Sequence, residues 1–294
     1  MNRLIKTVSG MAVSVLLISN VVGQQAELTP LTGALLMQRV VPASPVVQLR
    51  FINPGEASDS FFGSREESIN SGSYRLSGLI PVGENSAIEI ALPYQVRNTT
   101  YISSFFGESF TSETKASDIG NISVTYIKET NSKNSNLTNY LSLGVVLPTA
   151  GEDSWQGVFD NYYDFPAYTD EWMAFKGLFS IVKTGSRSVV IVEGGVDSWI
   201  HVGDEEEDVE FMGRYGVGYS FLPNENISLH AEFVGYGILS EEDIGDGSRF
   251  QHQLAVGARH QIGKFVPGIF YMKNFNDLGD VIPDGVAIEL SMTL

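Results

Sequence analysis

The sequence predicts an all-β fold: an antiparallel, up-and-down transmembrane β-barrel of about 12 strands. Three observations lead to this prediction. Apolar residues alternate with small or polar ones in almost every apolar segment, which is typical of strands whose two faces meet different surroundings. The connections between these segments alternate between short and long, and the long ones hold most of the acidic residues. Such sorting is typical of an outer-membrane barrel, with short periplasmic turns and long extracellular loops.

The overall composition excludes several classes of function. The chain has 294 residues, a formal net charge of −17 and no cysteine. Nucleic acid is excluded as a partner because phosphate binding needs clustered Lys and Arg. The absence of cysteine excludes disulfides, thiolate zinc sites and iron–sulfur clusters. No nucleophile elbow, His-Glu-x-x-His motif or phosphate loop is present, so we expect no cofactor and no enzyme activity.

The first 23 residues are predicted to be a cleaved export signal. Arg3 and Lys6 precede the short apolar run 11–22, and Gly23 marks the expected cleavage point. The run is too short and too polar to span a bilayer as a helix. Residues 24–44 contain few charges and many apolar side chains. They are expected either to fold back into the barrel as a plug or to form a periplasmic lead-in, and residues 45–294 to form the barrel.

The clearest alternation is at the end of the chain, where Val286, Ile288 and Leu290 alternate with Ala287 and Glu289. The same period of two marks the other predicted strands. In order, the predicted strands are 45–52, 71–80, 86–94, 119–128, 138–148, 172–183, 188–198, 210–221, 227–235, 249–260, 265–273 and 285–294.

The six long connections are expected to be extracellular loops. They span residues 53–70, 95–117, 150–171, 199–209, 236–248 and 274–283. Together they contain 23 acidic and three basic residues, a net charge of −20. The strands and short turns are therefore nearly neutral.

The two faces of the predicted strands are expected to differ in role. Aromatic residues near strand ends are candidates for the belts that bridge hydrocarbon and lipid head groups. These are Tyr94, Tyr126, Tyr140, Trp172, Trp199, Tyr219, Phe221 and Tyr271. Charged residues on the opposite face are candidates for lining the lumen, where they either set the selectivity of a pathway or pair with one another and fill it. The lumen candidates are Arg75, Glu89, Lys176, Glu193, Asp197, Arg214, His230, Glu232, Arg259 and Glu289.

Two further sites are weaker candidates. The acidic run Asp204, Glu205, Glu206, Glu207 and Asp208 offers oxygen ligands to divalent cations, although a solvated loop explains it more simply. Ser198 and His201 lie near one rim and are the basis for an alternative function as an outer-membrane hydrolase.

Two segments resemble a known family. They are Asp118-Ile-Gly-Asn-Ile-Ser-Val-Thr-Tyr126 and Leu141-Ser-Leu-Gly-Val-Val-Leu-Pro-Thr-Ala-Gly151. They resemble the outer-membrane β-barrel family assigned to transport in the meta-pathway of phenol degradation. Here Asn121 stands where Asp is common in that family, and Ala150 precedes Gly151. The resemblance implies a barrel that passes small, often hydrophobic or aromatic, molecules.

These observations favour a channel or facilitator for a small solute in the outer membrane of a Gram-negative bacterium. Its expected partners are membrane lipid and the solute, with divalent cations at the acidic loops as a further candidate. The alternative is a structural or adhesive barrel that acts through its acidic surface loops.

Overall fold

The computed structural model describes most of the chain. The described residues are 29–37, 40–54, 57–59, 65–105, 108–130, 136–157, 162–203, 209–240, 250–275 and 284–294. The predicted export signal, residues 1–23, lies outside them. Within the described part of the chain, no helix is both long and apolar enough to cross a membrane.

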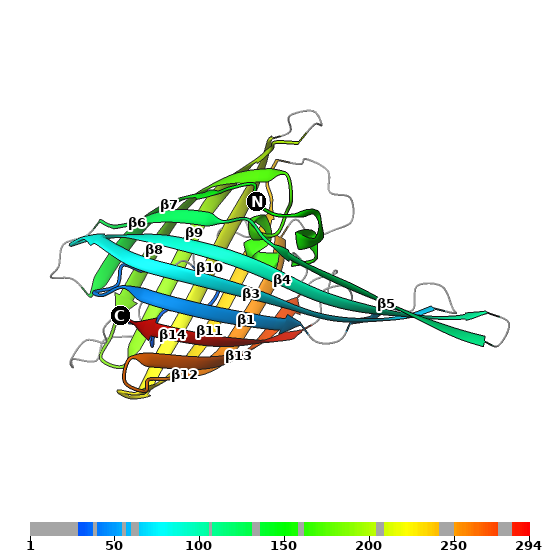
Figure 1. The fold of residues 1–294 in the computed structure, drawn as a ribbon. Helices are drawn as coiled ribbons and strands as arrows, with labels where there is room; N and C mark the ends of the chain where they lie inside the picture. Colours follow the sequence, from blue (N-terminus) through cyan, green and yellow to red (C-terminus); the bar gives the residue numbers. More distant parts are fainter. Residues whose placement is uncertain are drawn as a thin grey trace.

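Twelve strands form a closed antiparallel ring (Figure 1). In chain order they are β1 (Val46–Pro54), β3 (Arg65–Gly83), β4 (Ser86–Phe105), β6 (Ser123–Glu129), β7 (Leu137–Val146), β8 (Trp172–Thr184), β9 (Ser188–His201), β10 (Val209–Asn224), β11 (Ile227–Ile238), β12 (Phe250–His260), β13 (Phe265–Phe275) and β14 (Gly285–Thr293). The ring closes because β1 pairs with β14 on one side and with β3 on the other. Each wall strand overlaps one of the twelve predicted strands, so the predicted fold class is confirmed.

The prediction that residues 53–70 and 95–117 are loops is wrong in part. β3 and β4 continue far beyond the barrel as a hydrogen-bonded pair that reaches Arg65 and Ser103. Two additional strands, β2 (Ala57–Asp59) and β5 (Glu108–Ile119), pair with the outer parts of β3 and β4. The four strands form a twisted extension on one side of the barrel, at the right of Figure 1. The Ser- and Thr-rich sequences satisfy their backbone groups by pairing, although they carry little apolar alternation.

The alternation of side chains predicted from the sequence is present in the wall. In β14, Val286, Ile288 and Leu290 are exposed on the outside, whereas Glu289 is 1% exposed on the inside. The outer face of the other strands likewise presents Leu, Ile, Val, Phe and Tyr. An apolar outer face suits lipid, which offers no hydrogen bonds to polar side chains, and closure pairs the backbone groups between strands.

Three of the eight aromatic residues predicted to lie in the lipid-facing belts point into the barrel interior instead. Tyr140 and Trp199 are buried among residues of the interior, and Trp172 packs against the same interior cluster. Tyr94, Tyr126, Tyr219, Phe221 and Tyr271 are exposed on the outer face as expected. The three inward rings contribute to filling the interior.

A charged residue introduced on the outer face should lower the free energy of unfolding by an amount that depends on its depth in the bilayer. Ile269, near the middle of β13, is 59% exposed. Ile269→Lys is expected to lower the free energy of unfolding by ~2–4 kcal/mol in lipid vesicles, because a charge near the bilayer midplane loses its hydration. Urea titration of the refolded protein measures this cost. Val82→Lys, at the turn end of β3 where Val82 is 50% exposed, should cost at most about 1 kcal/mol; equal costs at the two positions would contradict a bilayer around this face.

Candidate functional site

All ten charged residues predicted for the lumen lie on the inner side of the wall. Several form close ion pairs between different strands. Arg259 Nε lies 2.9 Å from Glu289 Oε1, and Arg214 Nη2 lies 2.6 Å from Asp197 Oδ2. Arg75 Nη2 lies 3.6 Å from Glu89 Oε1. Pairing offsets the cost of removing these charges from water.

Three further members of this set, Glu193, His230 and Glu232, bond to hydroxyls or to backbone, and Lys176 pairs with Asp164 of a loop. Glu193 accepts a hydrogen bond of 3.0 Å from the Ser180 hydroxyl. The His230 ring lies between the Ser220 and Ser228 hydroxyls, 2.8 and 2.6 Å from its two nitrogens. The inner face is therefore a connected polar surface.

The N-terminal segment, which the structure describes at residues 29–37 and 40–45, lies inside the barrel and bonds to this surface. The Leu35 and Leu36 amides donate to the two carboxylate oxygens of Glu232, at 2.5 and 2.9 Å. The Ser228 hydroxyl and the Arg259 guanidinium donate to the Leu31 and Gly33 carbonyls. Inward-facing side chains thus satisfy backbone groups that strand pairing does not reach.

Apolar side chains of the N-terminal segment pack on the wall between these hydrogen bonds. Ala34, Met37 and Val40 belong to one buried cluster with wall residues, and Leu35 belongs to another. Met37 lies directly on Gly216 of β10, where any Cβ would come within 2.6 Å of its sulfur. The N-terminal segment is therefore closely packed against the wall of the lumen.

The connection between β7 and β8 also turns into the barrel. We name it the mouth loop; the structure describes its residues 147–157 and 162–171. It contains two short 3₁₀ helices, η1 (Glu152–Gln156) and η2 (Tyr162–Ala167). Phe165 of η2 packs on Trp199 with ring centroids 4.8 Å apart. The sequence prediction of a loop is correct here, but the loop is partly inside the barrel mouth because its aromatic residues bury themselves.

A single buried side chain, Asn121, fastens both halves of the mouth loop. Its Oδ1 accepts hydrogen bonds from the Thr149 and Ala150 amides at 2.8 and 2.7 Å. Its Nδ2 donates to the Pro166 and Thr169 carbonyls at 2.9 and 2.6 Å. An amide suits this position, since it accepts and donates at once, whereas an ionised carboxylate only accepts.

The two segments of the family resemblance meet at this fastening. Ile122 donates its amide to the Thr149 hydroxyl at 2.9 Å, and that hydroxyl donates to the Gly120 carbonyl at 3.2 Å. Gly151 lies against Asp118, where a Cβ would approach the carboxylate to 1.7 Å. The motif residues therefore hold the mouth loop in place.

The mouth loop brings Asp164 to the charged inner wall. One carboxylate oxygen lies 2.9 Å from Lys176 Nζ on β8, and the other contacts Arg75 Nη1 on β3. Burial by itself would raise the pKa of Asp164, but Arg75 and Lys176 outweigh this effect and hold the pKa below its usual range. Asp164 is therefore ionised at neutral pH.

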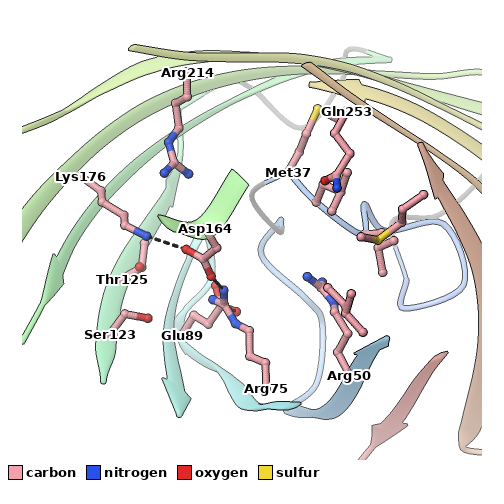
Figure 2. A pocket seen from close by; sticks show the side chains of 14 residues that line it. Met37, Arg50, Arg75, Glu89, Ser123, Thr125, Asp164, Lys176, Arg214 and Gln253 are labelled. Atoms are coloured by element: carbon pink, nitrogen blue, oxygen red, sulfur yellow. Dashed lines mark hydrogen bonds and ion pairs between the residues drawn. The ribbon is translucent and has the colours of Figure 1, made fainter. Parts of the chain in front are cut away.

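A cavity of about 60 Å³ lies between the N-terminal segment and the mouth loop. Asp164 enters it from the mouth loop and Met37 from the N-terminal segment, while Arg50, Arg75, Lys176, Arg214 and Glu89 project from the wall (Figure 2). Such a volume holds about four water molecules. A second cavity, of about 40 Å³, is lined by Thr29, Gly33 and Pro42 of the N-terminal segment together with wall residues. The N-terminal segment borders both cavities.

Sequence reasoning missed Asp164 and Arg50 as interior residues. The sequence places Asp164 among the acids of the long loop 150–171. The neighbouring Tyr, Phe and Pro residues of 162–168 are nevertheless a signal that this part of the loop is buried. Arg50 falls within the predicted strand 45–52. It lies opposite Glu289 and Arg75 only because β1 pairs with β14 and β3 when the barrel closes, and the local sequence does not show this pairing.

The weaker candidates find no support in the described residues. The acidic run 204–208 lies outside them, so its cation site stays a prediction. The described residues include no group of three or more His, Cys, Asp or Glu arranged for a metal. Ser198 and His201 are three residues apart on β9 and so point to opposite faces, and His201 lies 3.5 Å from Glu171.

The fold and interior define a class: a closed transmembrane β-barrel with an apolar outer face and a charged, occupied lumen. No family model matches the chain, and no curated protein matches it. The resemblance to the phenol-pathway family therefore stays a prediction.

Among solved structures, an outer membrane channel from Pseudomonas putida F1 is similar, with a TM-score of 0.55 and 12% identity, over 90% of this chain and 99% of that one. This similarity shows the fold. The TodX deltaS2S3 mutant monoaromatic hydrocarbon channel matches with a TM-score of 0.47 and 10% identity, over 86% of this chain and 91% of that one. The translocator domain of autotransporter NalP from Neisseria meningitidis matches with a TM-score of 0.45 and 13% identity, over 86% of this chain and 89% of that one.

Removing the fastening is expected to release the mouth loop. Asn121→Ala leaves four backbone groups of the mouth loop without their side-chain partner. The Pro166 carbonyl is the buried one among them, and one unsatisfied buried group costs ~1–3 kcal/mol. We expect the folded variant to be cleaved by a Glu-specific protease within the mouth loop at least about tenfold faster, since ~1.4 kcal/mol corresponds to a factor of ten. The matched control is Asn224→Ala in a turn at the opposite end, where Asn224 accepts from the Asn226 amide; equal cleavage of both variants would contradict the role of Asn121.

Proposed function

We propose that the protein is a channel for a small solute in the outer membrane of a Gram-negative bacterium. In this proposal residues 1–23 direct export and are removed. The N-terminal segment and the mouth loop close the lumen in the state described above. Opening requires that one or both withdraw.

The observation that carries the proposal is the cavity bounded by charged side chains inside the wall. A barrel that serves only as an anchor has no need for buried ion pairs, because apolar residues of similar volume are often equally or more stabilising. Charged and polar groups are instead what a water-filled pathway requires along its walls. Their concentration around one cavity supports transport over anchoring.

The way in which the lumen is closed also supports the proposal. The N-terminal segment joins the wall only at β1, and the mouth loop joins it at β7 and β8. The interior contacts described for them are packing and hydrogen bonds with side chains and loop backbone, such as those of Glu232 and Asn121. Their withdrawal therefore leaves the strand pairing of the wall intact.

The lining of the cavity supports a solute with both polar and apolar parts. Its apolar members are Leu35, Leu36, Met37, Ile52 and Met272. The hydrophobic or aromatic solute that the family resemblance implies would find contacts on this side. The charged side favours a polar substituent on the same molecule.

A second candidate function is binding of another macromolecule through the extension. β5 pairs with β4 along one edge, and most of residues 111–119 are exposed. Such a strand edge is a template for pairing with a further strand. A variant with a shortened extension that keeps its conductance but loses surface binding would support this second role.

The channel proposal predicts that the N-terminal segment limits conductance. Deletion of residues 24–44 is expected to raise the single-channel conductance in planar bilayers several-fold, because the segment fills part of the lumen. Heat-modifiable migration on a gel should confirm that the variant is folded.

The matched control for this measurement is Lys273→Gln, which changes an exposed residue at the rim of the outer face. Its conductance should equal that of the unmodified protein. If neither the full chain nor the deletion variant passes ions or small solutes, the channel proposal fails and an anchoring role replaces it.

A further inference from the structure

We propose that the cavity between the N-terminal segment and the mouth loop is a binding site for the carboxylate of a small organic monoanion. The Asp164 carboxylate occupies the position of that group in the closed state. The inference rests on the proposed function, because it names the class of solute that would pass, but the binding itself is measurable without transport.

The contacts of Asp164 are those of a bound carboxylate. Its two oxygens engage two cations from different strands, Lys176 of β8 at 2.9 Å and Arg75 of β3. Figure 2 shows this carboxylate between the ends of the Lys176 and Arg75 side chains, with a dashed line to Lys176. A planar group with two acceptor oxygens bridges such a pair of donors.

The charges around the cavity select for one negative charge. Four cations line it: Arg50, Arg75, Lys176 and Arg214. Glu89 and Asp197 lie within 4 Å of Arg75 and Arg214. Glu289 is shared between Arg50 and Arg259, and Glu232 also interacts electrostatically with these two arginines, so the two acids balance the two cations. Asp164 supplies the remaining negative charge, opposite Lys176. When it leaves, the site has an excess of one positive charge, which a monoanion neutralises and a dianion overcompensates.

Asp164 is carried by a loop and can be exchanged for a free ligand. It belongs to η2, whereas its partner cations belong to the wall. A tethered group competes with a free ligand through its effective concentration, typically millimolar for a flexible tether. A solute with the same carboxylate therefore displaces Asp164, which releases one of the contacts that hold the mouth loop inward.

The cavity also offers contacts to an apolar body. Leu35 and Met37 of the N-terminal segment line it together with Ile52 and Met272 of the wall. At about 60 Å³ the closed cavity is smaller than the roughly 150 Å³ of an apolar cavity known to hold benzene. A ring-sized acid consequently requires the space that Asp164 and the mouth loop vacate.

The test is binding of benzoate to the full chain refolded in detergent, measured by isothermal titration calorimetry at low ionic strength. Asp164→Asn is expected to bind benzoate at least about tenfold more tightly than the unmodified protein, because the competing carboxylate is gone. Asp164→Asn/Lys176→Met should lose this gain. Benzamide, the neutral analogue of benzoate, should bind to none of these proteins.

Asp284→Asn is the matched control. Asp284 is also a carboxylate that pairs with a lysine, Lys273 at 3.1 Å, but at an exposed position on the outer rim. Its substitution should leave the affinity for benzoate unchanged. Heat-modifiable migration verifies that each variant is folded.

Two outcomes would overturn the inference: benzoate affinity that does not rise in Asp164→Asn, or equal binding of benzamide. If Asp164→Asn does not fold, the tryptophan emission of the unmodified protein provides the test. Displacement of the mouth loop separates Phe165 from Trp199, so benzoate, and not benzamide, should change the tryptophan emission; an unchanged emission overturns the inference. Because these measurements need no membrane, a protein that binds benzoate but carries no current would refute the channel while retaining the site.

Discussion

In hydrocarbon every backbone amide and carbonyl needs a partner within the protein, and the rest of this structure depends on how that demand is met. The ring closes through β1, which pairs with β14 and β3 so that Leu49 lies between Leu290 and Leu76. Once this register is set, the period of two fixes the face of every wall residue. Leucines of the three strands turn outward together, and Arg50, Arg75 and Glu289 turn inward together. The charged lumen is thus a consequence of the same pairing that makes the exterior apolar.

The N-terminal segment and the mouth loop, inside the lumen, satisfy their backbone amides and carbonyls without pairing to a strand. The N-terminal segment depends on side chains of the wall, above all Glu232, to accept its amides, whereas the mouth loop depends on Asn121. If water enters the lumen, as the proposed channel requires, a hydrogen bond to a side chain can be exchanged for one to water at small net cost. The wall has no such alternative in lipid. In the proposed channel, this difference separates a permanent scaffold from the elements that withdraw.

The sequence predicts the wall and the inner face well because both follow from local alternation. The alternation of the neighbouring residues is enough to predict that Glu289 faces the lumen and Ile288 faces outward. Features that depend on distant parts of the chain are not visible in this way. Asp164 is an acid in a long loop until Arg75 and Lys176 come within reach, and these partners lie 89 and 12 residues away. The choice between plug and lead-in for residues 24–44 likewise depends on Glu232, 197 residues from Leu35. The extension escapes prediction because Ser and Thr occur equally in loops and in solvated strands.

β3 and β4 are long enough to extend well beyond the bilayer on one side of the barrel. With 19 and 20 residues at ~3.3 Å each, the pair is about 60 Å long, more than twice the ~25 Å of the apolar band. A tilt of ~40° still leaves roughly 20 Å of paired strand beyond the lipid. In the described part of the chain, this wall stands on one flank of the opening. We expect a body as large as an antibody to meet the wall when it approaches the opening from that flank.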